Sequence, residues 1–478
     1  MAFRDIREFI AKLEETGDIQ KIEQEVDWNL EIGAIMRRVN ETGANAPFFQ
    51  KIRGYGSEHR LFGCVLSTFR RLAIAMGLSP DTTPKEMIDI YEKRFNNPIK
   101  PVIVKDGPCK ENIMIGDEVN LYKFPAPMIH DGDGGRYFST WHVSITKDPD
   151  TDWVNWGMYR QMIHNRNTLG GLILPTQHIG LIYYPKYEGR GKPMPFAYAI
   201  GPEPISTFIA TTVVPYGVNE ADIVGGIRQE PIELIKCETN DLYVPATAEV
   251  VVEGEVEPNI RVDEGPFGEY TGYRASPRAP RPIFRVKAIT HRNNPVFTSS
   301  CMGVPYDSFT IPCAVTWSAE LRRTLLSFGI PIIDVYVHPV GATFWAIVST
   351  HTAYANIATK ISSAIWANPG GQYVTKVMVV NDDVDVFDIN DVMHAFVTKL
   401  HPVRGITVIE NAVGWPLMPY ANLDERLWGK GANVCFDLTW PIDWPPEIAI
   451  PPKSSFKYIY PERIQKKVLD NWKNYGYE

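Results

Sequence analysis

The sequence predicts an α/β protein in three parts: a small N-terminal α/β domain (residues 1–105), a central β-barrel or strongly curved sheet (106–310) and a C-terminal α/β domain (311–478). Three observations support this fold class. A chain of 478 residues is too long for one core of ordinary size. Helical and strand-like periods alternate toward both ends. The middle third is rich in β-like runs separated by Gly and Pro.

The N-terminal part begins with a helical pattern. Apolar residues recur at helical spacing through the first 13 residues, and Gly17 follows where a C-terminal cap belongs. A second amphipathic helix is predicted over residues 30–39. Short β-like runs then alternate with helical segments to about residue 100, which is typical of a small α/β domain.

The central part combines strands with one inserted helix. Runs such as residues 171–184, 248–256 and 281–292 are apolar, β-branched and punctuated by Gly or Pro. The segment Asn219 to Gln229 has helical periodicity instead, and Asn219 stands where its side chain could cap the helix.

The C-terminal part returns to alternating helices and strands. The pattern predicts a helix from Thr352 to Ala367, ended by Asn-Pro-Gly-Gly, then a buried strand that runs into an acidic turn, and a helix from Asp391. The segment 440–454 is too rich in proline for regular structure, so we expect an extended arm that packs on a neighbouring surface.

The composition narrows the functional classes. Hydrophobic residues make up 44% and charged residues 22%, as in a soluble globular protein. A net charge of −8 and the lack of a basic stripe argue against a nucleic-acid binder. No apolar run approaches the length of about 18 residues that a membrane span needs, and the start does not read as a signal peptide, so a cytoplasmic protein is predicted. The 6 cysteines form no CxxC pair, which is unlike a zinc knuckle or a disulfide scaffold.

The stretch EGPFGE places Glu264 and Glu269 on one tight turn. Pro266 fixes its own φ, while Gly265 and Gly268 permit backbone conformations that other residues avoid. Two carboxylates brought close in a partly desolvated site raise the pKa of one of them, which makes it a proton donor near neutral pH. The alternative is a surface turn whose acids are solvated.

Three further residues are candidates for chemistry upstream of this turn. Arg160 could clamp a carboxylate with two parallel hydrogen bonds or hold a nearby glutamate ionised, or it could be an ordinary surface arginine. His178 and Glu220, taken singly, also fit a structural histidine and a first-turn helix acid. The common nucleotide-binding and hydrolase signatures are absent, and the acidic stretch NDDVDVFD lacks the residues of a calcium loop.

Taken together, six segments resemble the UbiD family of reversible decarboxylases, which use prenylated flavin mononucleotide (prFMN). In chain order these segments are NWGMYRQ, PTQHIG, VNEADIVGGIR, EGPFGEYTGYR, VKAITHRNNPVF and VVNDDVDVFD. The likeness runs from residue 1 to about residue 450 and is greatest to the branch that acts on phenolic and other aromatic acids. It implies that the central part is a split β-barrel that binds the flavin and that the C-terminal α/β part mediates oligomerisation.

The resemblance implies a metal site beside the flavin phosphate. The family's ligand spacing falls on Asn155, His178 and Glu220, which would hold a divalent ion, usually Mn²⁺. A K⁺ ion is implied alongside, held by Glu220 and by backbone carbonyls that include Trp156 and residues 209–212. Oxygen and nitrogen ligands without thiolates suit such ions.

Other positions near the cofactor follow from the same resemblance. Gln177 matches a glutamine that lines the active site. The family carries a lysine near the cofactor at a register that falls on Thr375 here, and the neighbouring Lys376 is the lysine that could take its place. A shift of one residue on a strand points the side chain to the other face.

The implied catalytic residues are Arg160, Glu264 and Glu269. Glu269 corresponds to the proton donor or acceptor beside the reacting carbon, while Glu264 and Arg160 form an ion-pair network that tunes it and contacts the cofactor. His338 could bind a ring substituent of the substrate or be structural at a strand end. Trp415, with other aromatic residues such as Phe344 and Trp345, could line the substrate pocket or belong to the core.

The resemblance therefore predicts reversible, non-oxidative decarboxylation of an aromatic acid with release of CO2, and a flavin prenyltransferase that supplies the cofactor. A homodimer or homohexamer is implied as well. The sequence leaves open the direction of the reaction and the acid, whether hydroxylated, polycyclic, heteroaromatic or cinnamate-like. The alternatives are an FMN-dependent oxidoreductase on the same fold and a non-catalytic assembly subunit.

Overall fold

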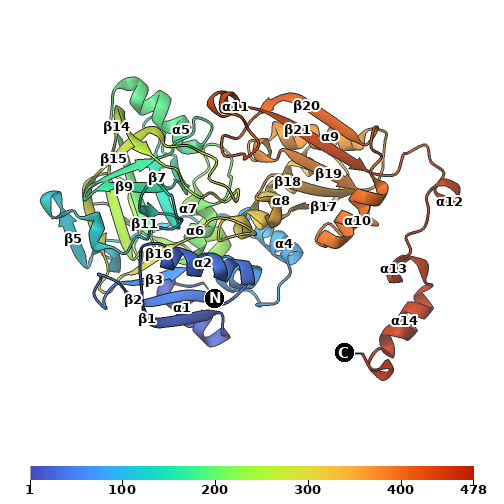
Figure 1. The fold of residues 1–478 in the computed structure, drawn as a ribbon, viewed down its shortest axis with the longest axis horizontal. Helices are drawn as coiled ribbons and strands as arrows, with labels where there is room; N and C mark the ends of the chain where they lie inside the picture. The colour runs from blue at the N-terminus through green and yellow to red at the C-terminus, as the bar shows by residue number, and fades with distance from the viewer. Residues whose placement is uncertain (1, 478) are drawn as a thin grey trace.

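The protein is described here by a computed structural model of residues 2–477, shown as a ribbon in Figure 1. Its N-terminal part is a small sheet covered by helices. The strand order is β1-β2-β3-β16, so a strand from far along the chain completes this sheet. The elements are α1 (Ile6–Thr16), β1 (Ile19–Val26), α2 (Glu31–Thr42), β2 (Ala46–Ile52), β3 (Arg60–Gly63), α3 (Phe69–Ala75), α4 (Pro84–Phe95) and β16 (Val296–Ser299).

The predicted first helix is confirmed, together with its predicted C-terminal cap. The Asp5 side chain accepts a hydrogen bond from the Glu8 N–H at the start of α1, and Gly17 ends the helix with a left-handed φ of 74°. The large apolar side chains of the helix are buried, and those of Phe9 and Leu13 are fully so. The predicted second helix occurs as α2 and extends three residues beyond the expected end, to Thr42.

The central part is an antiparallel sheet that curls into a half-barrel, as the sequence predicted (Figure 1). Its strand order is β6-β9-β10-β15-β14-β11-β7-β8, with β5 paired to β15. Its strands are β5 (Asn112–Ile115), β6 (Tyr137–Ser139), β7 (His142–Lys147), β8 (Val154–Gly157), β9 (Gln161–Asn165), β10 (Thr168–Gly171), β11 (Met194–Ile200), β14 (Val250–Glu264) and β15 (Ala279–His291). A separate small sheet contains β4 (Val102–Ile103), β12 (Glu233–Lys236) and β13 (Tyr243–Pro245).

Two long strands, β14 and β15, form the spine of the half-barrel and carry the turn with the two glutamates. Their register shifts between Glu253 and Gly254, as at a β-bulge. A Cβ on Gly254 would lie 1.9 Å from the Arg285 carbonyl oxygen, so glycine permits the close approach that bends the strand. Glu264 is the last residue of β14, and Glu269 follows in the connection to β15.

Three helices lie beside the half-barrel: α5 (His178–Ile182), α6 (Pro204–Ala210) and α7 (Glu220–Arg228). The predicted helix at 219–229 is confirmed, but the predicted side-chain cap is wrong. Asn219 occupies the cap position without capping, because its Oδ1 accepts a hydrogen bond from the Val154 N–H, 2.8 Å away. This bond ties the start of α7 to β8, so Glu220 faces the strand that carries Asn155.

The C-terminal part is a five-stranded sheet with strand order β17-β18-β19-β21-β20. The predicted helix from Thr352 begins five residues later, at Ile357, and the predicted helix from Asp391 begins at Ile389. The elements of this part are α8 (Thr310–Ser327), β17 (Ile332–Val337), β18 (Trp345–Thr350), α9 (Ile357–Ala367), β19 (Lys376–Val380), α10 (Ile389–Lys399), β20 (Ile406–Val413), α11 (Leu423–Trp428) and β21 (Lys430–Leu438).

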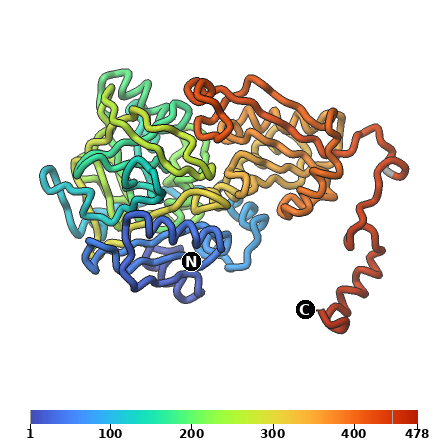
Figure 2. The backbone as a smooth tube through the Cα atoms, viewed as in Figure 1, coloured from blue at the N-terminus to red at the C-terminus, as the bar shows by residue number. Residues whose placement is uncertain are grey.

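The tail leaves the body of the molecule, as the backbone trace in Figure 2 shows. The proline-rich segment is mostly extended, although it contains a short helix, α12 (Pro446–Ala449), where no regular structure was expected. Two more helices follow, α13 (Phe456–Ile459) and α14 (Glu462–Asp470). None of the helices in residues 2–477 is long and apolar enough to cross a membrane.

Candidate active site

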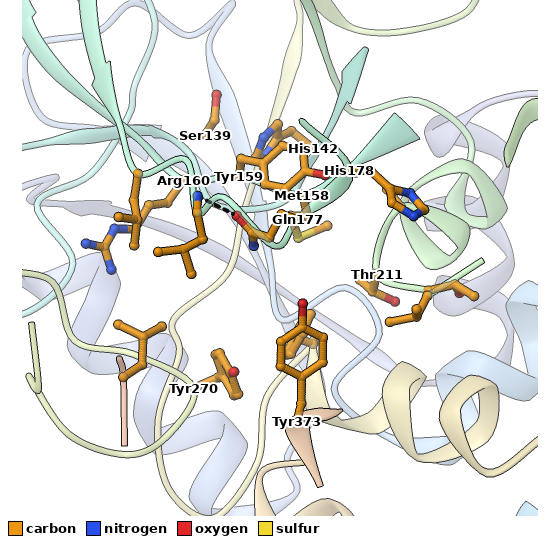
Figure 3. A pocket seen from close by; sticks show the side chains of 18 of the residues that line it. Ser139, His142, Met158, Tyr159, Arg160, Gln177, His178, Thr211, Tyr270 and Tyr373 are labelled. Carbon is orange, nitrogen blue, oxygen red and sulfur yellow. Dashed lines mark hydrogen bonds between the residues drawn. The ribbon is translucent and has the colours of Figure 1, made fainter. Parts of the chain in front are cut away.

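A cavity lies between the half-barrel, the start of α7 and the first turns of α8. Its wall contains eight of the residues that the sequence singled out, and Figure 3 shows several of them from close by. These eight residues are Asn155, Trp156, Arg160, Gln177, His178, Glu220, Glu269 and Trp415. The backbone segment 210–213 also lines the cavity, close to the carbonyls expected beside a monovalent ion.

Arg160 joins the two glutamates of the EGPFGE turn. Its Nε donates to Glu264 Oε1 over 2.9 Å and its Nη2 donates to Glu264 Oε2 over 3.0 Å. Its Nη1 contacts Glu269 Oε1. Both carboxylates are buried, so the guanidinium supplies the positive charge that they require. Burial alone would lower the pKa of Arg160, but the charge of Glu264 and the hydrogen bonds to it raise that pKa above its usual value.

The two glutamates have different positions relative to the cavity. Glu269 is part of the cavity wall, whereas Glu264 lies behind Arg160 and is not part of it. Sequence reasoning missed a third partner, Tyr137 on β6, whose hydroxyl donates to Glu264 Oε1 over 2.7 Å. With Arg160 on both oxygens and Tyr137 on one, Glu264 is fixed as a hydrogen-bond acceptor, and Glu269 is the acid that can reach a bound molecule.

The other side of the cavity gathers the three residues with the family's metal-ligand spacing. Glu220 Oε1 lies 3.8 Å from His178 Nδ1, and Glu220 Oε2 accepts the Trp156 N–H over 2.9 Å. Burial raises the pKa of the Glu220 carboxyl, and the nearby His178 imidazole and the hydrogen bond from the Trp156 N–H oppose this rise. Asn155 uses its Nδ2 to donate to Thr146 Oγ1, 3.4 Å away, so its Oδ1 is the side-chain atom left for a ligand.

Polar atoms on the cavity wall are available to a ligand. Within residues 2–477, the buried Ser139 Oγ and Trp317 Nε1 form no hydrogen bond with the protein. A buried polar group without a partner costs free energy, which a bound molecule with matching polar atoms would recover. His142 also lines the cavity, and burial lowers its pKa to about 3, so its imidazole is neutral at ordinary pH.

Aromatic side chains form the wall contributed by the C-terminal half of the chain. In Figure 3, Tyr270 and Tyr373 lie across the pocket from Arg160 and His178. The Tyr373 ring packs edge-on against Trp415 at a centroid distance of 4.5 Å. The aromatic residues that this half of the chain contributes to the wall are Phe267, Tyr270, Phe309, Trp317, Tyr373 and Trp415. Such a wall suits a flat apolar ring.

Besides Glu264, two sequence-predicted residues, Lys376 and His338, do not line this cavity. Lys376 lies in a separate groove, where its ammonium is 5.0 Å from the centre of the Tyr420 ring, and burial lowers its pKa. His338 caps a short 3₁₀ turn by accepting the Val340 N–H at its Nδ1, and burial lowers its pKa to about 4. These contacts fit the structural alternative for His338. Among the other aromatic candidates, Phe344 and Trp345 line the groove with Lys376.

Comparison with known proteins identifies the family. Three family models match the chain: the N-terminal domain of 3-octaprenyl-4-hydroxybenzoate carboxy-lyase (UbiD) at residues 10–91, its Rift-related domain at 100–305 and its C-terminal domain at 313–438. The chain is 33% identical to the pyrrole-2-carboxylic acid decarboxylase of Pseudomonas aeruginosa, over 99% of this chain and 98% of the relative.

Two solved structures extend the likeness to the whole fold. The vanillic acid decarboxylase of Sedimentibacter hydroxybenzoicus in its closed form superposes with a TM-score of 0.89 at 31% identity, covering 99% of this chain and 100% of that one. An evolved dimeric UbiD-class enzyme of Pelotomaculum thermopropionicum in complex with prFMN gives 0.79 at 28% identity, covering 94% and 97%. The chain therefore belongs to the UbiD family and is a carboxy-lyase of the branch that acts on aromatic acids.

Proposed function

We propose that the protein catalyses the reversible, non-oxidative decarboxylation of an aromatic carboxylic acid with prFMN, and that Glu269 supplies the proton. One observation carries this proposal: a single cavity brings the Asn155, His178 and Glu220 side chains together with the Arg160–Glu269 pair and an aromatic wall. A cofactor-anchoring side, an acid and a ring-binding surface are what the reaction requires.

The residues present fit the cofactor and its ions. Asn155, His178 and Glu220 offer two oxygen donors and one imidazole, and they would hold a divalent ion such as Mn²⁺. Three side chains leave coordination positions for oxygens from a phosphate or water, so the ion would join the flavin phosphate to the protein. Glu220 and the backbone carbonyls of Trp156 and of residues 209–212 are the groups that would hold K⁺.

Loss of a carboxylate from an aromatic ring leaves an electron pair that no protein side chain can accept, and prFMN is the group that would supply the electron acceptor. The chain itself binds and orients the ring against Tyr270 and Tyr373 and excludes water from it. As CO2 departs, the ring carbon needs one proton. Glu269 holds that proton at a carboxyl oxygen, and Arg160 fixes the position of the same carboxyl group.

The proposal is tested by producing the protein with and without a flavin prenyltransferase. We expect protein from coexpression to show the absorbance and intact cofactor mass of prFMN, to contain Mn²⁺ and K⁺, and to release CO2 from at least one member of a panel of aromatic acids. Protein made without the prenyltransferase should be inactive. An FMN-loaded protein that releases no CO2, or full turnover without the prenyltransferase, would contradict the proposal.

Glu220→Gln is expected to lower the retention of Mn²⁺ and flavin by at least about 10²-fold, because loss of even an outer-sphere partner of a metal typically costs 10- to 100-fold in affinity. Glutamine keeps an oxygen that can accept the Trp156 N–H, so the fold of β8 and α7 should survive. Metal content by mass spectrometry and flavin absorbance after dialysis measure the loss without any assay of turnover.

Glu253→Gln is the matched control for this variant. Glu253 is also fully buried and also accepts backbone N–H groups, those of Glu238 and Thr239, but it lies outside the cavity. We expect it to retain metal and flavin at the wild-type level. Equal retention in both variants would remove Glu220 from the proposed metal site.

A further inference from the structure

The loop at residues 130–135, with sequence HDGDGG, packs on the back of the turn at residues 264–269 that carries the two glutamates. The Gly134 N–H donates to the Pro266 carbonyl over 2.7 Å. A Cβ on Gly134 would lie 2.0 Å from the Gly265 carbonyl oxygen, so only glycine permits this approach. The two segments are therefore in direct backbone contact.

Asp133 is the side chain of this loop that holds the turn. Its carboxylate is fully buried, and its Oδ1 accepts the Gly268 N–H over 2.9 Å. Its Oδ2 accepts the backbone N–H of His130 over 3.1 Å and lies 3.0 Å from His130 Nδ1. Gly268 directly precedes Glu269, so the N–H that Asp133 accepts belongs to the residue next to the proposed proton donor.

His130 lies beside the buried Asp133 side chain and supplies a positive charge next to it. Its Nδ1 faces Asp133 Oδ2, and its Nε2 lies 3.1 Å from the carbonyl oxygen of Met302. Both ring nitrogens thus face acceptors, and only the imidazolium can donate to both. Burial alone would lower the pKa of His130, but the contacts with Asp133 and Cys301 raise it to about 10.

No other side chain in residues 2–477 accepts a hydrogen bond from the backbone N–H groups of residues 265–269. The remaining backbone contacts of Glu269 are to its own segment: its N–H donates to the Tyr273 carbonyl over 3.3 Å, and its carbonyl accepts the Gly272 N–H. Hydrogen bonds to a charged acceptor are about twice as strong as neutral ones. Asp133 is therefore the main charged anchor of this backbone.

We propose that Asp133 and His130 are positioning residues for the reaction: the buried carboxylate–imidazolium pair holds the Gly268 N–H and thereby sets the place of the Glu269 carboxyl in the cavity wall. The inference rests on the proposed function in that Glu269 is taken as the proton donor. The pair also links the turn to Met302, which lines the same cavity, so Glu269 and a second segment of the wall share one support. A misplacement of about 1 Å at a reacting group can cost about 10² in rate.

The test compares Asp133→Ala with Asp133→Asn in the holoenzyme. Alanine removes the acceptor for the Gly268 N–H, so kcat should fall about 10²-fold while KM changes by less than about threefold, as expected for lost positioning without lost binding. Asparagine keeps a side-chain oxygen for that N–H and can donate to a neutral His130, although it loses the acceptor for the His130 backbone N–H, so it should restore kcat to within about tenfold of wild type. A drop of equal size in both variants would overturn the inference.

A second readout needs no substrate. Hydrogen–deuterium exchange of the peptide covering residues 264–274 should accelerate about tenfold or more in Asp133→Ala and by less than about threefold in Asp133→Asn, because local opening of the turn governs exchange of its amides. Asp18→Ala is the control. Like Asp133, Asp18 is buried and paired with a basic side chain, in this case Arg70 at 2.8 Å, but it lies in the N-terminal part of the chain. It should change neither exchange of this peptide nor kcat.

The two readouts separate this inference from the proposed function. If the wild-type holoenzyme decarboxylates no acid, the proposed function fails, while the exchange measurement still decides whether Asp133 holds the turn. Unchanged exchange in Asp133→Ala overturns the inference whatever the activity. If Asp133→Ala does not fold, His130→Gln replaces it, with an expected fall of about tenfold in kcat at unchanged KM; wild-type kcat in that variant would count against the inference.

Discussion

Glu269→Gln is expected to lower kcat of the holoenzyme by about 10²- to 10⁴-fold, the range that general acid catalysis typically contributes. Glutamine keeps an oxygen for the Nη1 of Arg160, so the arrangement of the cavity wall should be preserved. It cannot carry the proton that the ring carbon needs after CO2 leaves. The loss should therefore fall on the chemical step, with KM and cofactor content close to wild type.

Rapid-quench turnover and product exchange in D2O measure this prediction in two ways. Exchange of the ring hydrogen of the product uses the same proton transfer without any CO2, so it should slow by a similar factor. Glu255→Gln is the control, since Glu255 lies on the same strand as Glu264 and pairs with Lys287 away from the cavity. Near-normal turnover in Glu269→Gln would show that another group of the cavity wall donates the proton.

The family and the separate site residues could be predicted from the sequence because they lie in short continuous motifs. A tight turn with two glutamates is visible as EGPFGE, and the ion pair to Arg160 follows from the resemblance. The partners that complete this site are not local. Tyr137 is 127 residues from Glu264, and Asp133 is 135 residues from Gly268, and neither stands in a pattern that distinguishes it from an ordinary buried tyrosine or loop aspartate.

Two errors in the predicted helices also arise from contacts between residues that are far apart in the sequence. Periodicity places residues 352–356 in a helix, yet the Thr352 hydroxyl donates to the Trp440 carbonyl and accepts from Asn381, so tertiary contacts hold this segment outside α9. Asn219 likewise has the right residue type for a helix cap, but its side chain binds the backbone of β8 instead. In both cases a long-range hydrogen bond outweighs a local preference of about 1 kcal/mol.

Arg160→Met is expected to have the largest effect on stability as well as a loss of turnover. Removing one partner of a buried ion pair typically costs about 3–5 kcal/mol, because the charge left behind stays buried without compensation. Here two carboxylates are left, Glu264 and Glu269, which are 1% and 6% exposed. Methionine fills similar space, so the cost comes from charge and not from a cavity. Thermal and urea unfolding of the apo protein measure it.

The destabilisation should depend on pH in a defined direction. In Arg160→Met, two neighbouring buried carboxyls lose their counter-charge, and both burial and mutual repulsion favour the neutral, protonated form of at least one of them. A rise in pH forces this group to ionise inside the protein, so the free energy of unfolding of the variant falls as pH rises. The free energy of unfolding of Arg160→Met should accordingly lie further below that of the wild type at pH 8 than at pH 5.

An exposed ion pair with the same two hydrogen bonds serves as the control, because its loss removes the hydrogen bonds without leaving a buried charge. Arg190 donates to both carboxylate oxygens of Asp150, over 2.7 and 2.6 Å, but both side chains are more than 40% exposed. Arg190→Met should leave the thermal and urea unfolding midpoints nearly unchanged, with little dependence on pH, because water solvates the remaining carboxylate. If Arg160→Met were equally mild, Glu264 and Glu269 would be neutral or solvated in the folded protein. The Arg160 charge would then have no part in holding an acid at the cavity wall.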